Sequence, residues 1–171
     1  MALQKFLSLI NGVITSITAV DTSAGVADAG KLVALDITGK LADTLMPLGV
    51  GTDVLVAPAS EALAAGDAVN IWADTGTVKI RKANATDATK PAHGFVKAAV
   101  ESASNASVYF EGVNAQLTGL TVGSRYYLSA ATPGAITATP PAVAGNVVQY
   151  IGTPHAVGAI RFEPGPAITL A

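Results

Sequence analysis

Short apolar runs, separated by turns rich in Gly, Asn, Asp and Thr, recur about every ten residues along most of the chain. This spacing is typical of β-sandwiches and β-barrels. Helical patterns are weak because glycine, proline and β-branched residues interrupt them too often. The pattern predicts an all-β protein.

The first 20 residues permit two interpretations. Their apolar positions are spaced three and four residues apart, as in a coiled-coil seam: Leu3, Phe6, Ile10, Val13, Ile17 and Val20. The seam covers fewer than three heptads, and Asn11-Gly12 at its centre is a strong signal for a two-residue hairpin turn. Residues 13–20 are also rich in Ile, Val and Thr, which favour strands. We therefore favour a β-hairpin over a short coiled-coil helix.

Residues 1–52 as a whole predict an extended N-terminal arm. Beyond the possible hairpin they are low in charge, are interrupted repeatedly by glycine, and offer too little contiguous apolar sequence for a core. From residue 53 onward the pattern predicts a compact β domain, a barrel or a sandwich.

The β domain contains an internal two-fold repeat, with units of about 53–112 and 113–171. Matching positions are Leu63 with Leu120, Gly66 with Gly123, Val69 with Tyr126, Gly76 with Gly134, Gly94 with Gln149, Val108 with Ile160, and Phe110 with Phe162. We expect Phe110 and Phe162 to be equivalent core residues. Two copies fit a barrel or sandwich made of two similar sheets.

Composition changes this picture in one respect. Only 13% of the residues are charged, against about 25% in an ordinary soluble domain, which favours a chain that lives packed against partners. The net charge of −2 gives no reason to expect a nucleic acid or a membrane as partner. There is no cysteine, so disulfides and thiolate metal sites are excluded. We find no signal peptide and expect synthesis and assembly in the cytoplasm.

The sequence gives little reason to expect a catalytic site. His93 and His155 have no second His or Cys nearby, so we expect no metal site and no cofactor. Glu111 and Glu163 occupy equivalent positions and would form a carboxylate pair if they faced each other, but a role in closing their strands is the simpler interpretation. Trp72, Tyr126 and Tyr127 offer a stacking platform or, more simply, core and interface residues. We expect no enzyme.

Several phrases of the sequence resemble capsid decoration (cement) proteins of tailed bacteriophages. In the arm these are 28–36, Gly39-Lys40-Leu41 and Met46-Pro47. In the β domain they are 92–96, 108–112, Tyr126-Tyr127-Leu128-Ser129, 145–149 and 161–164. Related strings also occur in phage fibre proteins. The resemblance spans nearly the whole chain, and its motifs are structural.

The resemblance implies a virion protein on the outer surface of the phage head, often a homotrimer, with the major capsid protein as partner. We assign lattice binding and trimer entwining to the arm, through Leu3, Phe6, Leu7, Ile10, Leu32, Leu35, Leu41 and Met46. The alternative for these side chains is packing on the chain's own β domain. The alternative function is a tail- or head-fibre module that binds the host surface, and a third is an enzyme with an unrecognised site.

Overall fold

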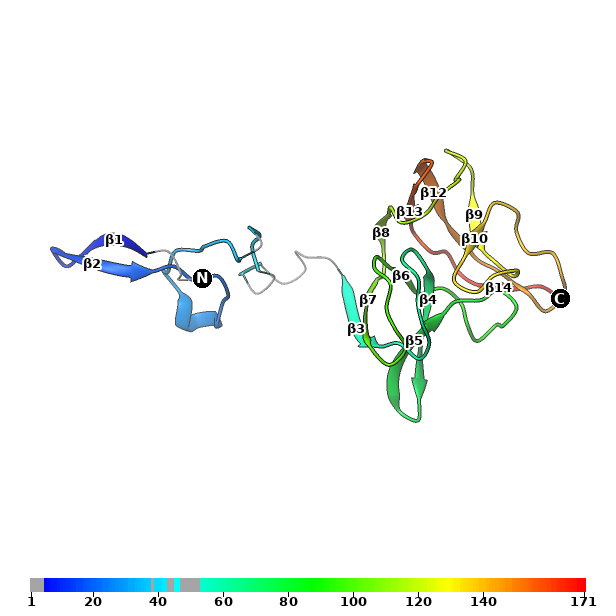
Figure 1. Cartoon of the computed structure of the whole chain (residues 1–171), viewed down its shortest axis with the longest axis horizontal. Helices are drawn as coiled ribbons and strands as arrows, with labels where there is room; N and C mark the ends of the chain where they lie inside the picture. The colour runs from blue at the N-terminus through cyan, green and yellow to red at the C-terminus, as the bar shows by residue number, and fades with distance from the viewer. Residues whose placement is uncertain (1–4, 38, 43–44, 47–52) are drawn as a thin grey trace. The chain divides into compact units, whose positions relative to one another are not determined.

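The computed structural model describes residues 5–37, 39–42, 45–46 and 53–171 (Figure 1). The chain divides into two units, residues 1–52 and 53–171, at the position where the sequence places the boundary. Among the described residues strands dominate, and helical structure is confined to 3-10 geometry, as in η1 (Gly25–Asp28). The prediction of an all-β protein is confirmed.

The N-terminal unit begins with a β-hairpin. Strands β1 (Lys5–Ile10) and β2 (Val13–Thr18) pair in antiparallel register, with Ile10 opposite Val13. The turn residues Asn11 and Gly12 have φ angles of 48° and 80°, and two positive φ angles in succession are what a type I′ turn requires. The hairpin is confirmed and the coiled-coil helix is wrong, because this turn reverses the chain where a helix would continue.

The rest of the N-terminal unit is held by backbone bonds. The Val20 N–H donates to the Leu32 carbonyl at 2.9 Å, and the Ala34 N–H donates to the Val20 carbonyl at 2.8 Å. Ala19 is the only buried residue among those described in this unit. The described residues of this unit therefore form no hydrophobic core.

The β domain consists of two five-stranded antiparallel sheets (Figure 1). The first contains β3 (Val54–Pro58), β4 (Ala68–Asp74), β5 (Thr77–Lys82), β6 (Gly94–Val96) and β7 (Asn105–Tyr109), in the order β3-β7-β6-β4-β5. The second contains β8 (Gly112–Asn114), β9 (Tyr126–Leu128), β10 (Ile136–Thr137), β12 (Tyr150–Ala156) and β13 (Ala159–Phe162), in the order β8-β13-β12-β9-β10. A separate pair joins β11 (Val147–Val148) to β14 (Ile168–Thr169). Replacing β3, β4, β5, β6 and β7 by β8, β9, β10, β12 and β13 converts one order into the other, which confirms the internal repeat.

Backbone hydrogen bonds repeat as well. The Gly66 N–H donates to the Val96 carbonyl at 2.8 Å, and the Gly123 N–H donates to the Pro154 carbonyl at 3.0 Å. Both glycines have positive φ angles, 92° and 77°. Two loops in different parts of the domain therefore deliver their strands in the same way.

One expected equivalence has the wrong register. Val69 lies opposite Gly94 in the first sheet, and its counterpart Tyr126 lies opposite Gly152 in the second. The structural counterpart of Gly94 is therefore Gly152, three residues beyond Gln149. Gly76 to Gly94 and Gly134 to Gly152 each span 18 residues, whereas the sequence comparison ended the second segment at Gln149, three residues too early.

The expected equivalence of Phe110 and Phe162 as core residues is also wrong in part. Phe162 is fully buried, and its ring centroid lies 5.0 Å from that of Phe95. Phe110 directly follows β7 and is only half-buried. The two residues occupy the same repeat position, but the second repeat is covered there and the first is not.

Three apolar clusters stabilise the domain. The first repeat encloses Ala57, Ala59, Leu63, Val69, Ile80, Val96, Ala106 and Val108. The second encloses Leu120, Tyr126 and Ile160, the counterparts of Leu63, Val69 and Val108. The third cluster joins the repeats and contains Ala68, Ala83, Ala85, Ala92, Phe95, Leu128, Ile151 and Phe162.

Neither described sheet closes into a barrel. In the first sheet the two edge strands approach each other where the Ser60 N–H, just beyond β3, donates to the Ile80 carbonyl at 2.7 Å. Only an isolated bridge between Ala59 and Ile80 forms there, without a continuous ladder. The domain is therefore a pair of packed, curved sheets.

Two glycines at the repeated strand crossing give a first test. A Cβ at Gly94 would lie 2.5 Å from Val108 Cγ1 and 2.6 Å from the Tyr109 carbonyl oxygen, and one at Gly152 would overlap the Arg161 carbonyl oxygen. We expect Gly94→Ala and Gly152→Ala each to lower the free energy of unfolding by about 1–3 kcal/mol or more, because the paired strands must move apart. Urea denaturation measures this.

Gly165→Ala is the matched control, because its Cβ would meet nothing closer than Tyr150 Cβ at 3.6 Å. Wild-type stability for Gly94→Ala or Gly152→Ala would contradict this account of the crossing.

Candidate interaction surfaces

The side chains predicted for binding lie on the N-terminal unit, and most are exposed. Leu3 is outside the described residues, and Phe6 is half-buried. The others are exposed: Leu7, Ile10, Leu32, Leu35, Leu41 and Met46. Leu7, at 73% exposure, is the most accessible of them.

The hairpin presents apolar side chains on both of its faces. Cross-strand register places Leu7, Leu9 and Ile14 on one face. The other face carries Phe6, Ile10, Val13 and Ile17. Sequence reasoning did not select Leu9, Val13 and Ile14 as binding residues, although all three are exposed. Leu9 and Ile14 fall outside the heptad spacing, and a period of two would have found them.

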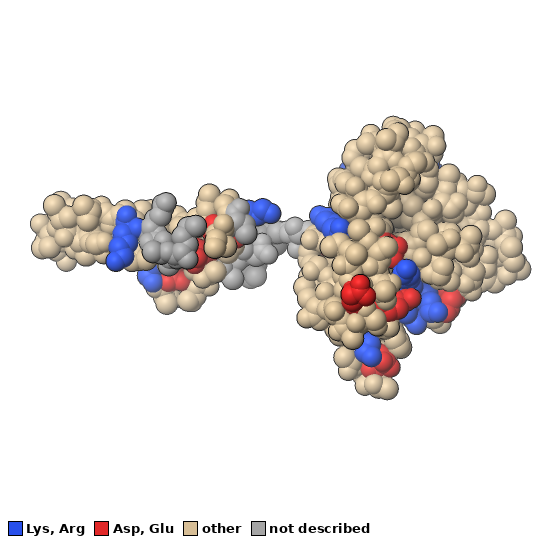
Figure 2. Space-filling view, in the orientation of Figure 1, with Lys and Arg blue, Asp and Glu red and all other residues tan. Residues whose placement is uncertain are grey.

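No charged residue occurs between Lys5 and Asp21. In Figure 2 the hairpin beyond Lys5 is accordingly an uninterrupted tan surface on the face shown. Exposed apolar surface without charge marks an interaction site in a soluble protein. The hairpin is therefore the strongest candidate for a contact with another chain.

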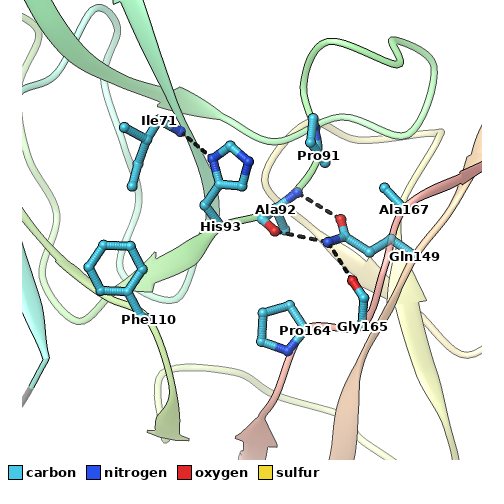
Figure 3. Close-up of a pocket in the computed structure, with 9 residues that line it drawn as sticks. All are labelled: Ile71, Pro91, Ala92, His93, Phe110, Gln149, Pro164, Gly165 and Ala167. Carbon is cyan, nitrogen blue, oxygen red and sulfur yellow. Dashed lines mark hydrogen bonds between the residues drawn. The ribbon is translucent and has the colours of Figure 1, made fainter.

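A pocket of about 630 Å³ opens at the end of the first repeat (Figure 3). We call it the first-repeat pocket; its lining residues are Ile71, Pro91, Ala92, His93, Phe110, Gln149, Pro164, Gly165 and Ala167. The first repeat contributes the residues up to Phe110, and the segment around and after β13 covers the other side. The lining is mainly apolar.

Gln149 closes the inner wall of this pocket. Its Oε1 accepts from the Ala92 N–H at 2.7 Å, and its Nε2 donates to the carbonyls of Ala92 at 2.9 Å and Gly165 at 3.1 Å. The side chain is buried, so its amide is committed to holding three segments together.

His93 supplies the ionisable group of the pocket. Its Nδ1 accepts from the Ile71 N–H at 3.0 Å, which places the proton of the neutral ring on Nε2. Partial burial of the ring, with the nearby Arg81 charge, holds the pKa of His93 below its usual value. At neutral pH the ring is an uncharged donor.

A second hollow, of about 660 Å³, lies on the second sheet. We call it the second-repeat groove; its lining residues are Val113, Tyr150, Thr153, Pro154, His155, Arg161 and Glu163. Arg161 Nε lies 3.3 Å from Glu163 Oε2, and both side chains are well exposed. The Tyr150 hydroxyl lies 2.8 Å from Thr153 Oγ1. The groove therefore carries a charged pair and two hydroxyls, although most of its lining surface, like that of the first-repeat pocket, is apolar.

The candidate catalytic groups are not assembled into one site. Glu163 lines the second-repeat groove beside Arg161, and Glu111 is not among the lining residues of that groove. His93 and His155 line different hollows. In the part of the chain that the structure describes, no three His, Cys, Asp or Glu side chains are grouped to hold a metal ion.

Trp72, Tyr126 and Tyr127 do not share one stacking platform, and Tyr126 is a core residue as the simpler interpretation has it. Tyr126 is buried, and its hydroxyl accepts from the Thr121 N–H at 3.0 Å. Trp72 is half-buried and stacks beneath the Arg81 guanidinium, 4.8 Å from the ring centroid. Tyr127 instead meets Tyr150 edge to face, with 6.3 Å between centroids.

None of the described helical segments has the length and apolar character of a membrane span.

No family model, curated protein or solved structure matches this chain. The functional argument therefore rests on the surfaces of the chain itself.

The Gln149 tether gives a second test. Gln149→Leu keeps the volume but leaves the Ala92 N–H and two carbonyls without partners in a buried place. We expect the free energy of unfolding to fall by about 2–4 kcal/mol, since each buried unpaired group costs about 1–3 kcal/mol. Thermal and urea unfolding measure it.

Gln116→Leu is the control, because Gln116 is exposed and its side chain makes no hydrogen bond among those found in the β domain. Equal stability of the two variants would show that the tether contributes nothing.

Proposed function

We propose that this chain is a virion structural protein, a capsid decoration (cement) protein that binds the outside of a phage head and stabilises it by bridging major capsid subunits. The observation that carries the proposal is the N-terminal hairpin, uncharged from Phe6 to Val20 and apolar on both faces. The resemblance of the sequence to capsid cement proteins supplies the partner.

The hairpin is unsuited to an independent existence. A two-stranded sheet is marginally stable in water on its own, and this one has no buried side chain in its strands. Burying one Leu or Ile side chain contributes about 1.5–3 kcal/mol. Covering both faces with protein therefore gives a large gain, and that gain favours binding between neighbouring chains.

A shell lattice is a partner that provides such cover. A protein that binds only the mature lattice stabilises that state by mass action. In a homotrimer each further arm binds at high effective concentration, because the first contact already holds the assembly on the shell. The low charge of the chain, 13% of residues, suits a protein that is packed among others. In this proposal the β domain is the exposed part.

The test uses phage heads that lack this protein. Purified wild-type chain is added back, and the heads are challenged by heat and by chelation. The variant Leu7→Ser/Leu9→Ser/Ile14→Ser removes one apolar face of the hairpin. We expect it to bind heads at least tenfold more weakly than wild type, because more than 1.4 kcal/mol of burial is lost, and to restore less heat resistance.

The matched control is Val122→Ser/Val143→Ser/Val157→Ser, three exposed positions of the β domain. It should bind heads as the wild type does. A wild-type chain that stays monomeric and has no affinity for mature heads would overturn the proposal. If heads without the protein were equally stable but virions no longer attached to the host, a fibre module would replace it.

A further inference from the structure

The two repeats of the β domain pack head to tail. The first sheet contributes one outer face, on which Ala68, Phe95 and Tyr109 are cross-strand neighbours. The second repeat contributes one end of its own interior, at Leu128, Ile151 and Phe162. Phe95 and Phe162 meet at 5.0 Å between ring centroids. Two different surfaces are therefore joined, and each repeat uses only one of them here.

The receiving end has a counterpart in the first repeat. Strand register makes Gly94 and Gly152 equivalent positions of the two repeats, so His93 corresponds to Ile151. Ile71 corresponds to Leu128, because each lies two residues after the matched positions Val69 and Tyr126. Phe110 corresponds to Phe162, because each directly follows the matched positions Tyr109 and Arg161. These three counterparts, Ile71, His93 and Phe110, all line the first-repeat pocket. This pocket is the same receiving end, lined on one side by residues 164–167 of the second repeat and open on the other.

The outer face has a counterpart in the second repeat. Phe95 pairs with Tyr109 across the first sheet, and Thr153 pairs with Arg161 across the second. Lys97 corresponds to His155, three residues beyond the matched glycine in each repeat. Thr153, His155 and Arg161 line the second-repeat groove. This groove is the same outer face, left uncovered.

From this we infer that a second copy of the chain docks its second-repeat groove onto the first-repeat pocket, and so repeats between chains the contact that joins the two repeats within one chain. The contact is heterologous, because the two surfaces differ. Such contacts build rings when the rotation closes. The inference does not depend on the capsid role proposed above.

The side chains fit a reversible version of the internal contact. Thr153 and Arg161 replace Phe95 and Tyr109, so the contact between chains is more polar. A cation already belongs to this arrangement within the chain, since Lys97 Nζ lies 3.9 Å from the Tyr109 ring centroid. In the second repeat Arg161 stands at the position of Tyr109 and His155 at that of Lys97, so a cation is again present on this face, and Phe110 of the pocket offers it an aromatic face. The exchange keeps the contact specific while lowering its apolar content.

Engineered cysteines test the contact directly, because the chain has no cysteine of its own. The internal neighbours Phe162 and Phe95 correspond to Phe110 and Thr153, so these two should be adjacent across chains. The full-length Phe110→Cys/Thr153→Cys variant is oxidised mildly and run on a non-reducing denaturing gel. We expect most of it to shift from monomer to covalent dimers and larger species.

The single variants are the controls. Phe110→Cys alone and Thr153→Cys alone should stay monomeric, and an equimolar mixture of the two should give dimers and nothing larger. Cross-linking of either single variant with itself would show a two-fold contact and overturn the inference. A double variant that is folded by circular dichroism but remains monomeric would also overturn it.

A charge variant tests the contact without cysteine. Arg161 is 74% exposed, so Arg161→Asp should leave the fold intact. We expect it to raise the dissociation constant between chains at least tenfold in analytical ultracentrifugation. Lys79→Asp on β5 makes the same charge change away from both surfaces and should leave the dissociation constant unchanged. Equal effects of the two variants would count against the inference.

Discussion

The β domain depends on one apolar contact, the cluster in which Phe95 of the first repeat meets Leu128, Ile151 and Phe162 of the second. Each repeat encloses a small core of its own, and that of the second repeat is built on only Leu120, Tyr126 and Ile160. Units of this size bury too little surface to be stable alone. The second repeat in particular depends on the first to close its open end. Gln149 also joins Ala92 of the first repeat to Gly165 after β13, which adds polar contacts across the junction.

The N-terminal unit follows the opposite logic. Its turn and strand pairing are specified locally by Asn11-Gly12, and Ala19 alone is buried among its described residues. A segment built in this way has a defined shape before it has a partner, which reduces the ordering cost of binding. The β domain folds around its own apolar clusters, so the side chains of the hairpin are not needed for its core and can be suited to binding. The chain therefore combines a unit that folds around its own apolar clusters with a unit that exposes its apolar side chains.

Local signals in the sequence were enough for the all-β class, the hairpin and the repeat, because turns and strand alternation act over a few residues. The register of β12 was not predicted correctly, because similar short apolar strings at 148–151 and 151–154 leave the match open by three residues and only the pairing of Gly152 with Tyr126 fixes it. Phe110 could not be distinguished from Phe162 either. The two occupy the same position in the repeat, and only the packing of one repeat against the other buries Phe162. The pocket and the groove result from that same nonlocal packing, so no short sequence motif predicts them. Leu9 and Ile14 follow the period of two that the favoured hairpin predicts, but they were not selected as binding residues.

Gly94 and Gly152 limit how far the two halves of the domain can drift apart as their sequences change. At most positions a duplicated segment can accept new side chains, as the exchanges of Phe95 for Thr153 and Tyr109 for Arg161 illustrate. At the crossing of β6 with β7, and of β12 with β13, every other amino acid would add atoms where a neighbouring carbonyl already lies. Mutation can therefore alter the exposed side chains of each half independently while the strand crossing stays the same. Related sequences would be expected to keep glycine at these two positions even where the rest of the two halves differs.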